Sequence, residues 1–129
     1  MSHKGFRRAD RVAERIRSEL MDLLLRGSMR DPAAKDVVVS SVRVTDDLSI
    51  ARIYVRVLQE IGPERQDAVV DALERGAGFL RRELGQRLGL RHVPSLEFYW
   101  DDVVDSALRI ESILDEISDG TDTGSKESK

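Results

Sequence analysis

Two strand-like segments separated by a short polar turn constrain the fold of this chain more than any other feature. Residues 37–44 are rich in valine, and residues 50–58 alternate apolar with polar side chains, as a strand with one buried face does. Only the polar residues 45–49 lie between them. Because so short a connection joins antiparallel neighbours, the two segments predict a β-hairpin.

Helical periodicity occupies most of the remaining sequence. Apolar residues recur every three or four positions over residues 9–25 and again over residues 63–88. The second stripe is interrupted at residues 76–78 (Gly-Ala-Gly). Since glycine inside a helix costs about 1 kcal/mol relative to alanine, we expect a kink that splits this segment into two helices. Side chains alternate again over residues 96–101, which predicts a third strand, and residues 103–117 form a further amphipathic segment.

The predicted order is helix, strand, strand, helix, kink, helix, strand and C-terminal helix, which is an α+β arrangement. The economical packing is one three-stranded sheet with the helices on one face. We expect residues 1–117 to form one domain, which is long enough to bury a core. Residues 118–129 contain no apolar side chain, and we expect a disordered tail there.

Composition argues against most kinds of chemistry. The chain has no cysteine, which excludes disulfides and thiolate sites, and its two histidines are not paired at metal-binding spacing. The acid pairs Asp46-Asp47 and Asp101-Asp102 have no nearby histidine or serine that would complete a catalytic set. No segment approaches the roughly 18 apolar residues of a membrane helix. We therefore expect a cytosolic protein without catalytic residues, metal or cofactor.

Charge is distributed unevenly along the chain. The net charge is −3, yet residues 1–30 hold eight Lys/Arg against four Asp/Glu, and residues 72–92 hold five Arg against two Glu. Residues 97–129 hold ten acids against three bases. A phosphate backbone meets the local potential rather than the net charge, so two basic segments on one face would suit a nucleic acid.

A group of arginines follows the helical period in the first basic segment: Arg7, Arg8, Arg11 and Arg15. Arginine suits phosphate because its planar guanidinium bonds two oxygens at once. The alternative is a solvated helix face on which these arginines pair with neighbouring acids. A second basic segment in the same chain favours the phosphate interpretation.

The kink region is a second candidate, formed by Arg75, Gly76, Ala77, Gly78, Arg81 and Arg82. Glycines permit close backbone approach and expose amides at the start of the next helix, where a phosphate binds favourably. The alternative is a packing adjustment where two helices cross. Sequence alone does not decide between the two.

Arg52, Tyr54 and Arg56 share the polar face of the second strand. Such a face can stack RNA bases. Because only one aromatic residue is present there, we favour an ordinary exposed or covered sheet face.

Five stretches, in order, resemble the bacterial ribosome-binding factor A family. They are residues 8–12 (Arg-Ala-Asp-Arg-Val), Asp31-Pro32, the hairpin residues 42–55, residues 78–85 after the kink, and residues 90–98 before the last strand. Each stretch is weak alone, but five in the right order and spacing are specific. The resemblance covers roughly residues 6–117.

The resemblance implies a KH-like fold of the second type, in which a kink of the pattern Ala-x-Gly replaces the usual GxxG loop; here Gly76 stands in the alanine place. It further implies a monomeric partner of the free or immature 30S small subunit. Such a protein contacts 16S rRNA, supports late rRNA processing and cold adaptation, and takes no small-molecule substrate. The alternative is a protein-interaction module that docks a partner through the acidic C-terminal helix, residues 103–117.

Overall fold

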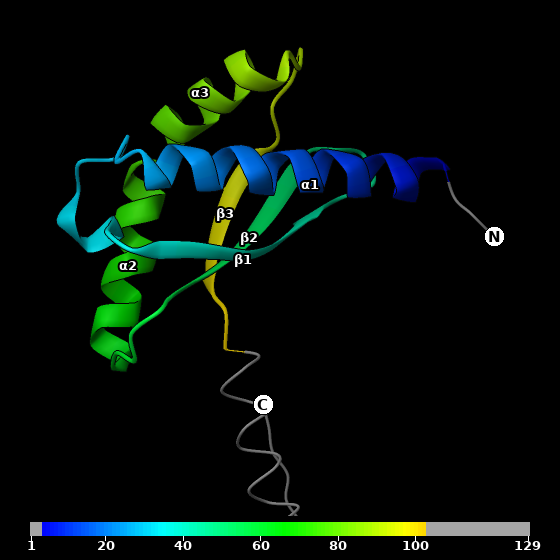
Figure 1. The fold of residues 1–129 in the computed structure, drawn as a ribbon. Helices are drawn as coiled ribbons and strands as arrows, with labels where there is room; N and C mark the ends of the chain where they lie inside the picture. Colours follow the sequence, from blue (N-terminus) through cyan, green and yellow to red (C-terminus); the bar gives the residue numbers. More distant parts are fainter. Residues whose placement is uncertain (1–3, 103–129) are drawn as a thin grey trace, which may run out of the picture.

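The computed structural model describes residues 4–102 and contains three α-helices, a short 3-10 turn and three strands. The predicted C-terminal helix and the tail lie outside the described residues, as do residues 1–3. The elements follow in the predicted order (Figure 1): α1 (Lys4–Leu25), η1 (Pro32–Ala34), β1 (Val37–Val44), β2 (Ile50–Val57), α2 (Pro63–Arg75), α3 (Ala77–Leu88) and β3 (Ser95–Trp100). The first helix begins earlier than its apolar stripe, and β2 ends at Val57 rather than at the exposed Leu58.

The sheet is mixed, with strand order β1-β2-β3. β1 and β2 form the predicted antiparallel hairpin, with an irregularity between Val39 and Ser41. β3 runs parallel to β2, in a register that places Ala51 opposite Leu96 and Val55 opposite Trp100. This parallel pairing requires a crossover, which α2 and α3 provide.

The helices cover one face of the sheet and bury an aliphatic core between them (Figure 1). The alternation in β2 sets which face is buried, because Ala51, Ile53 and Val55 are each fully inaccessible. The helices contribute residues spaced three or four apart to the same core: Ile16, Leu20, Leu23, Val69, Ala72, Leu73, Leu80, Leu84 and Leu88. The prediction of an α+β domain with helices on one face of the sheet is confirmed.

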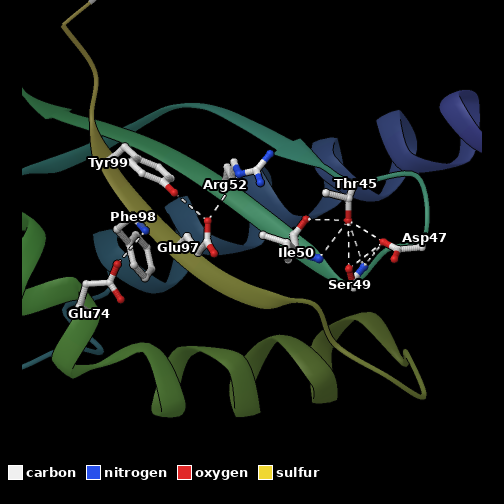
Figure 2. A network of polar contacts seen from close by, with 9 residues as sticks. All are labelled: Thr45, Asp47, Ser49, Ile50, Arg52, Glu74, Glu97, Phe98 and Tyr99. Carbon is white, nitrogen blue, oxygen red and sulfur yellow. Dashed lines mark hydrogen bonds and ion pairs between the residues drawn. The ribbon is translucent and has the colours of Figure 1, made fainter.

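A polar network closes the hairpin (Figure 2). Asp47 Oδ1 accepts hydrogen bonds from Ser49 Oγ at 2.7 Å, from Thr45 Oγ1 at 2.8 Å and from Ser49 N at 3.1 Å. The bond from the Ser49 hydroxyl is the largest cause of a lowered pKa at Asp47. Asp47 therefore has a structural role in the turn, because three donors from the same loop already bond to its Oδ1.

Helix α2 is tied to the edge strand by a side chain. Glu74 Oε2 accepts a hydrogen bond from the backbone N–H of Phe98 at 3.0 Å (Figure 2). Phe98 turns its ring into the core, where 3% of its surface remains accessible. The helix thus supplies an acceptor to an edge-strand amide that has no further strand beside it.

Residues 4–102 include no helix with the length and apolar character needed to cross a membrane. They also contain no cluster of three or more His, Asp or Glu side chains arranged to hold a metal ion.

Candidate nucleic-acid interface

Three of the predicted arginines lie in one exposed row along α1, here called the α1 row: Arg8, Arg11 and Arg15. Their spacing of three and four residues places them on the same side of the helix. Within the described part of the chain, none of the three makes a hydrogen bond or ion pair. The side chain of Arg7, the fourth predicted member, lies outside the described residues. The α1 row is therefore available to a ligand.

The side of α1 that carries this row continues into two acids that hold α3. Glu19 and Asp22 follow Arg15 at helical spacing. Arg87 Nη1 on α3 donates to Asp22 Oδ2 at 2.7 Å and to Glu19 Oε1 at 2.9 Å. These bonds lower the pKa of Asp22 and raise the pKa of Arg87. Helix α3 therefore lies on the same side of α1 as the α1 row, and both acids are occupied by a cation.

Helix α3 runs back along α1 in the opposite direction (Figure 1). Gly76, just before α3, packs against Met29, which follows the C-terminal end of α1. Arg87, near the other end of α3, reaches Glu19, further back along α1. The residues that follow α3 are thus directed toward the N-terminal half of α1, where the α1 row lies.

A second cationic group lines an open groove of about 500 Å³ between α3 and the loop that follows it. This α3 groove is lined by Gly78, Arg81, Arg82, Gly85, Gln86, Leu90, Arg91, His92 and Val93, and no carboxylate is among its lining residues. Arg81 is fixed in place because its Nη2 and Nε donate to the Val93 carbonyl at 2.8 and 3.1 Å. Arg82 and Arg91 are exposed. Cations without neighbouring acids make the groove suitable for an anion.

Arg91 and His92 are groove residues that the sequence prediction missed. Arg91 was counted in the basic segment 72–92, but it follows the helix and belongs to no periodic pattern. Only the return of the loop alongside α3 brings it near Arg81 and Arg82. The only sequence signal for Arg91 is the excess of arginine over residues 72–92. Such a count does not predict which of the arginines lie next to one another in the fold.

Arg75 is directed away from the groove. Its Nη2 donates to Asp31 Oδ2 at 2.6 Å, which lowers the pKa of Asp31. Asp31 also accepts from the backbone N–H of Ala33 and so caps the short 3-10 turn. Arg75 therefore ties α2 to the loop after α1, and its proposed contact with phosphate stays a prediction.

The helix break at Gly76 confirms the predicted kink. Gly76 ends α2 and begins α3, with φ −91° and ψ 5°, and its N–H bonds back to Ala72 O. A Cβ built on Gly76 would lie 2.7 Å from Met29 Cε, whereas one on Gly78 would meet nothing within 4 Å. Gly76 thus packs closely against the flexible end of the Met29 side chain, and a role of this segment in binding phosphate stays a prediction.

We expect Gly76→Ala to be tolerated. The negative φ suits alanine, and alanine gains about 0.5–1 kcal/mol over glycine in a helix. The clash is with the terminal methyl group of a flexible methionine, which can move by rotation. The midpoint of thermal unfolding should therefore stay within about 4 °C of the original value. Gly76→Val is the matched control, because its branched side chain cannot avoid Met29 and should lower the midpoint clearly.

The predicted residues thus form two groups that flank α3. Arg87 faces α1, while Arg81, six residues earlier and on another side of the helix, faces Val93. The structure brings Arg8, Arg11 and Arg15 together in one group, and Arg81 and Arg82 together in the other. It does not bring Arg75 to either of them.

The element order, the mixed three-stranded sheet and the helix break at Gly76 define a KH-like domain of the second type without a GxxG loop. The sequence model of the family described as Ribosome-binding factor A matches residues 8–114. The chain belongs to the ribosome-binding factor A family.

Individual relatives agree with this assignment. Ribosome-binding factor A of Sorangium cellulosum is 44% identical over 118 residues, which cover 89% of this chain and 92% of the relative. The crystal structure of ribosome-binding factor A from Thermus thermophilus matches the fold with a TM-score of 0.62 at 24% identity, over 71% of this chain and 93% of that one. A homology model of the Thermus thermophilus factor, fitted into the cryo-electron microscopy map of a 30S–RbfA complex, matches with a TM-score of 0.51 at 26% identity, over 67% of this chain and 92% of that one.

Proposed function

We propose that this chain binds the free or immature small ribosomal subunit, contacts its 16S rRNA, and supports late processing and maturation of that RNA, including growth in the cold. It acts in the cytoplasm as a monomer, by binding rather than by catalysis. The α1 row and the α3 groove supply the phosphate-contacting side chains.

One observation carries this proposal: a member of the ribosome-binding factor A family displays an exposed row of arginines that form no ion pair with any acid of residues 4–102. In an anionic chain, unpaired cations in a row keep a locally positive potential, which attracts a phosphate backbone. The Thermus thermophilus relative fitted into a 30S complex supports the small subunit as the partner.

Sedimentation through a sucrose gradient tests the proposal. The tagged full-length chain, expressed at its natural level, is expected to migrate with free small subunits and to be absent from translating ribosomes, because an assembly factor must leave before translation. Purified large subunits serve as the control for general attraction to rRNA. A chain that stays at the top of the gradient, or that binds large and small subunits equally, would contradict the proposal.

A further inference from the structure

The face of the sheet opposite the helices carries a compact group of aromatic and cationic side chains. The strand register gives one row of Arg43, Arg52 and Glu97 across the three strands, and a neighbouring row of Ser41, Tyr54 and Tyr99. Arg56, two residues after Tyr54 on β2, extends this face. In Figure 2, Arg52 and Tyr99 lie in front of the sheet while α1 passes behind it. Arg43, Arg52, Arg56 and Glu97 therefore lie around the two tyrosines, and Arg56 Nη1 donates to the Asp101 carbonyl at 3.3 Å.

The two tyrosines form a stacked pair. Their ring centroids are 5.4 Å apart and the ring planes are inclined by 26°. Tyr99 is 40% exposed although it is a large aromatic residue. Its hydroxyl donates to Glu97 Oε1 at 2.7 Å, and Arg52 Nε lies 3.5 Å from the same oxygen. This chain of contacts holds the exposed ring in a fixed position on the sheet surface (Figure 2).

Tyr54 is partly exposed and has a small residue on its other side. Its cross-strand neighbour on β1 is Ser41, whose side chain is small and exposed. Arg43, two residues further along β1, makes no hydrogen bond or ion pair within residues 4–102. A flat ring can therefore approach the tyrosine pair, and the unpaired cation of Arg43 lies beside it.

A cross-strand tyrosine pair also stabilises a sheet by itself, by about 0.2–1 kcal/mol. That role explains the contact between the rings. It does not explain why an exposed aromatic surface is bordered by three arginines, of which one is unpaired. Aromatic rings flanked by cations are the combination that binds unpaired nucleotides, because bases stack on the rings while phosphates meet the cations.

We propose that the outer face of the sheet, centred on Tyr54 and Tyr99, stacks unpaired bases of single-stranded RNA. The charge of the face favours a polyanion over an apolar protein segment, and the stacked rings favour bases over an acidic protein segment or a helical phosphate backbone. The inference rests on the proposed function of binding 16S rRNA, but it concerns the outer face of the sheet, which lies opposite the helices that include the α1 row. The chain would then hold two RNA segments, one on each side.

Binding of a fluorescein-labelled, unstructured 12-nucleotide RNA, followed by fluorescence anisotropy, tests the proposal. The measurement uses the full-length chain with Arg8, Arg11 and Arg15 replaced by alanine, so that the α1 row does not contribute. In that background Tyr99→Ala should weaken binding about tenfold, since one stacked base is lost. Tyr99→Phe keeps the ring and should bind as before. Arg43→Glu, at an unpaired position, should also weaken binding.

Leu58→Ala is the matched control, because Leu58 is 86% exposed and lies beyond the end of β2. It should leave RNA affinity unchanged. The proposal is overturned if Tyr99→Ala and Arg43→Glu bind the RNA as tightly as their parent, or if Tyr99→Phe loses as much as Tyr99→Ala. RNA containing 4-thiouridine should photocrosslink to Tyr54 or Tyr99, and crosslinks confined to other elements would also overturn it. Small-subunit association of the unsubstituted chain is measured separately, so failure of the proposed function and failure of base stacking are distinguished.

Discussion

Replacing Arg8, Arg11 and Arg15 together with alanine is expected to weaken association with the small subunit about a hundredfold at about 0.15 M salt. Each phosphate contact releases close to one counterion, which is worth about fivefold in affinity at that salt concentration. All three side chains are exposed and unpaired in the described part of the chain, so their loss should hardly change the stability of the fold. Binding of purified small subunits, measured at several salt concentrations, checks the expectation.

The salt dependence of affinity is a second, independent test of whether these three arginines contact phosphate. The slope of log affinity against log salt should become shallower by about 2 to 3, because three fewer counterions are released. A loss of affinity with an unchanged slope would mean that the arginines act through the fold and not through phosphate.

A matched triple variant separates the α1 row from net charge. Arg30, Lys35 and Arg65 are also exposed and unpaired within residues 4–102, but they lie outside α1 and α3. Replacing these three with alanine removes the same total charge. We expect a small uniform decrease in affinity. Equal losses in the two triple variants would reject the α1 row as the interface.

The buried face of the hairpin could be predicted from the sequence because alternation in a strand has a period of two. The alternation over residues 50–58 predicts one buried face, and Ala51, Ile53 and Val55 on that face are all inaccessible. The kink at Gly76 was predictable for a similar local reason, since glycine interrupts a continuous helical stripe. Local periodicity is sufficient for these features because each depends on residues close in sequence.

Contacts between distant segments were not predictable in this way. Nothing in residues 95–100 says that β3 pairs with β2 in parallel, because periodicity fixes the faces of a strand and not its neighbour. The pairing of Arg87 with Glu19 and Asp22 joins α3, which follows the hairpin in the sequence, to α1, which precedes it. It places α3 beside the α1 row and separates that row from Arg81. The prediction that both basic segments share one cationic face depends on this placement of α3 and stays a prediction.

The tyrosine pair shows the same limit at smaller scale. Tyr54 was discounted as a stacking residue because it is the only aromatic residue on the polar face of β2. Its partner, Tyr99, lies on a different strand and becomes adjacent only through the register of β2 with β3. A count of residues along one strand therefore underestimates what a face of the sheet contains.

Leu84→Ala is expected to reduce the free energy of unfolding by about 3 kcal/mol, because truncation of a buried leucine loses transfer free energy and leaves a cavity. Leu84 is fully inaccessible, and its helix packs against both α1 and β3. The break at Gly76 interrupts the backbone bonding between α2 and α3, so packing of this kind must hold α3 in place. The midpoint of thermal unfolding should fall by about 10 to 15 °C, as measured by circular dichroism.

Arg82→Ala is the control on the same helix, since Arg82 is exposed and unpaired in the described part of the chain. It should change stability by no more than about 0.5 kcal/mol. If Leu84→Ala also changed stability by less than about 1 kcal/mol, the packing of α3 would not be what holds the helix, and the ion pairs of Arg87 would have to do so. Water and salt screen ion pairs at the surface of a protein, so these pairs cannot replace a buried leucine. The geometry of the α3 groove therefore depends on the apolar side of α3, although every cation in the groove lies outside the core.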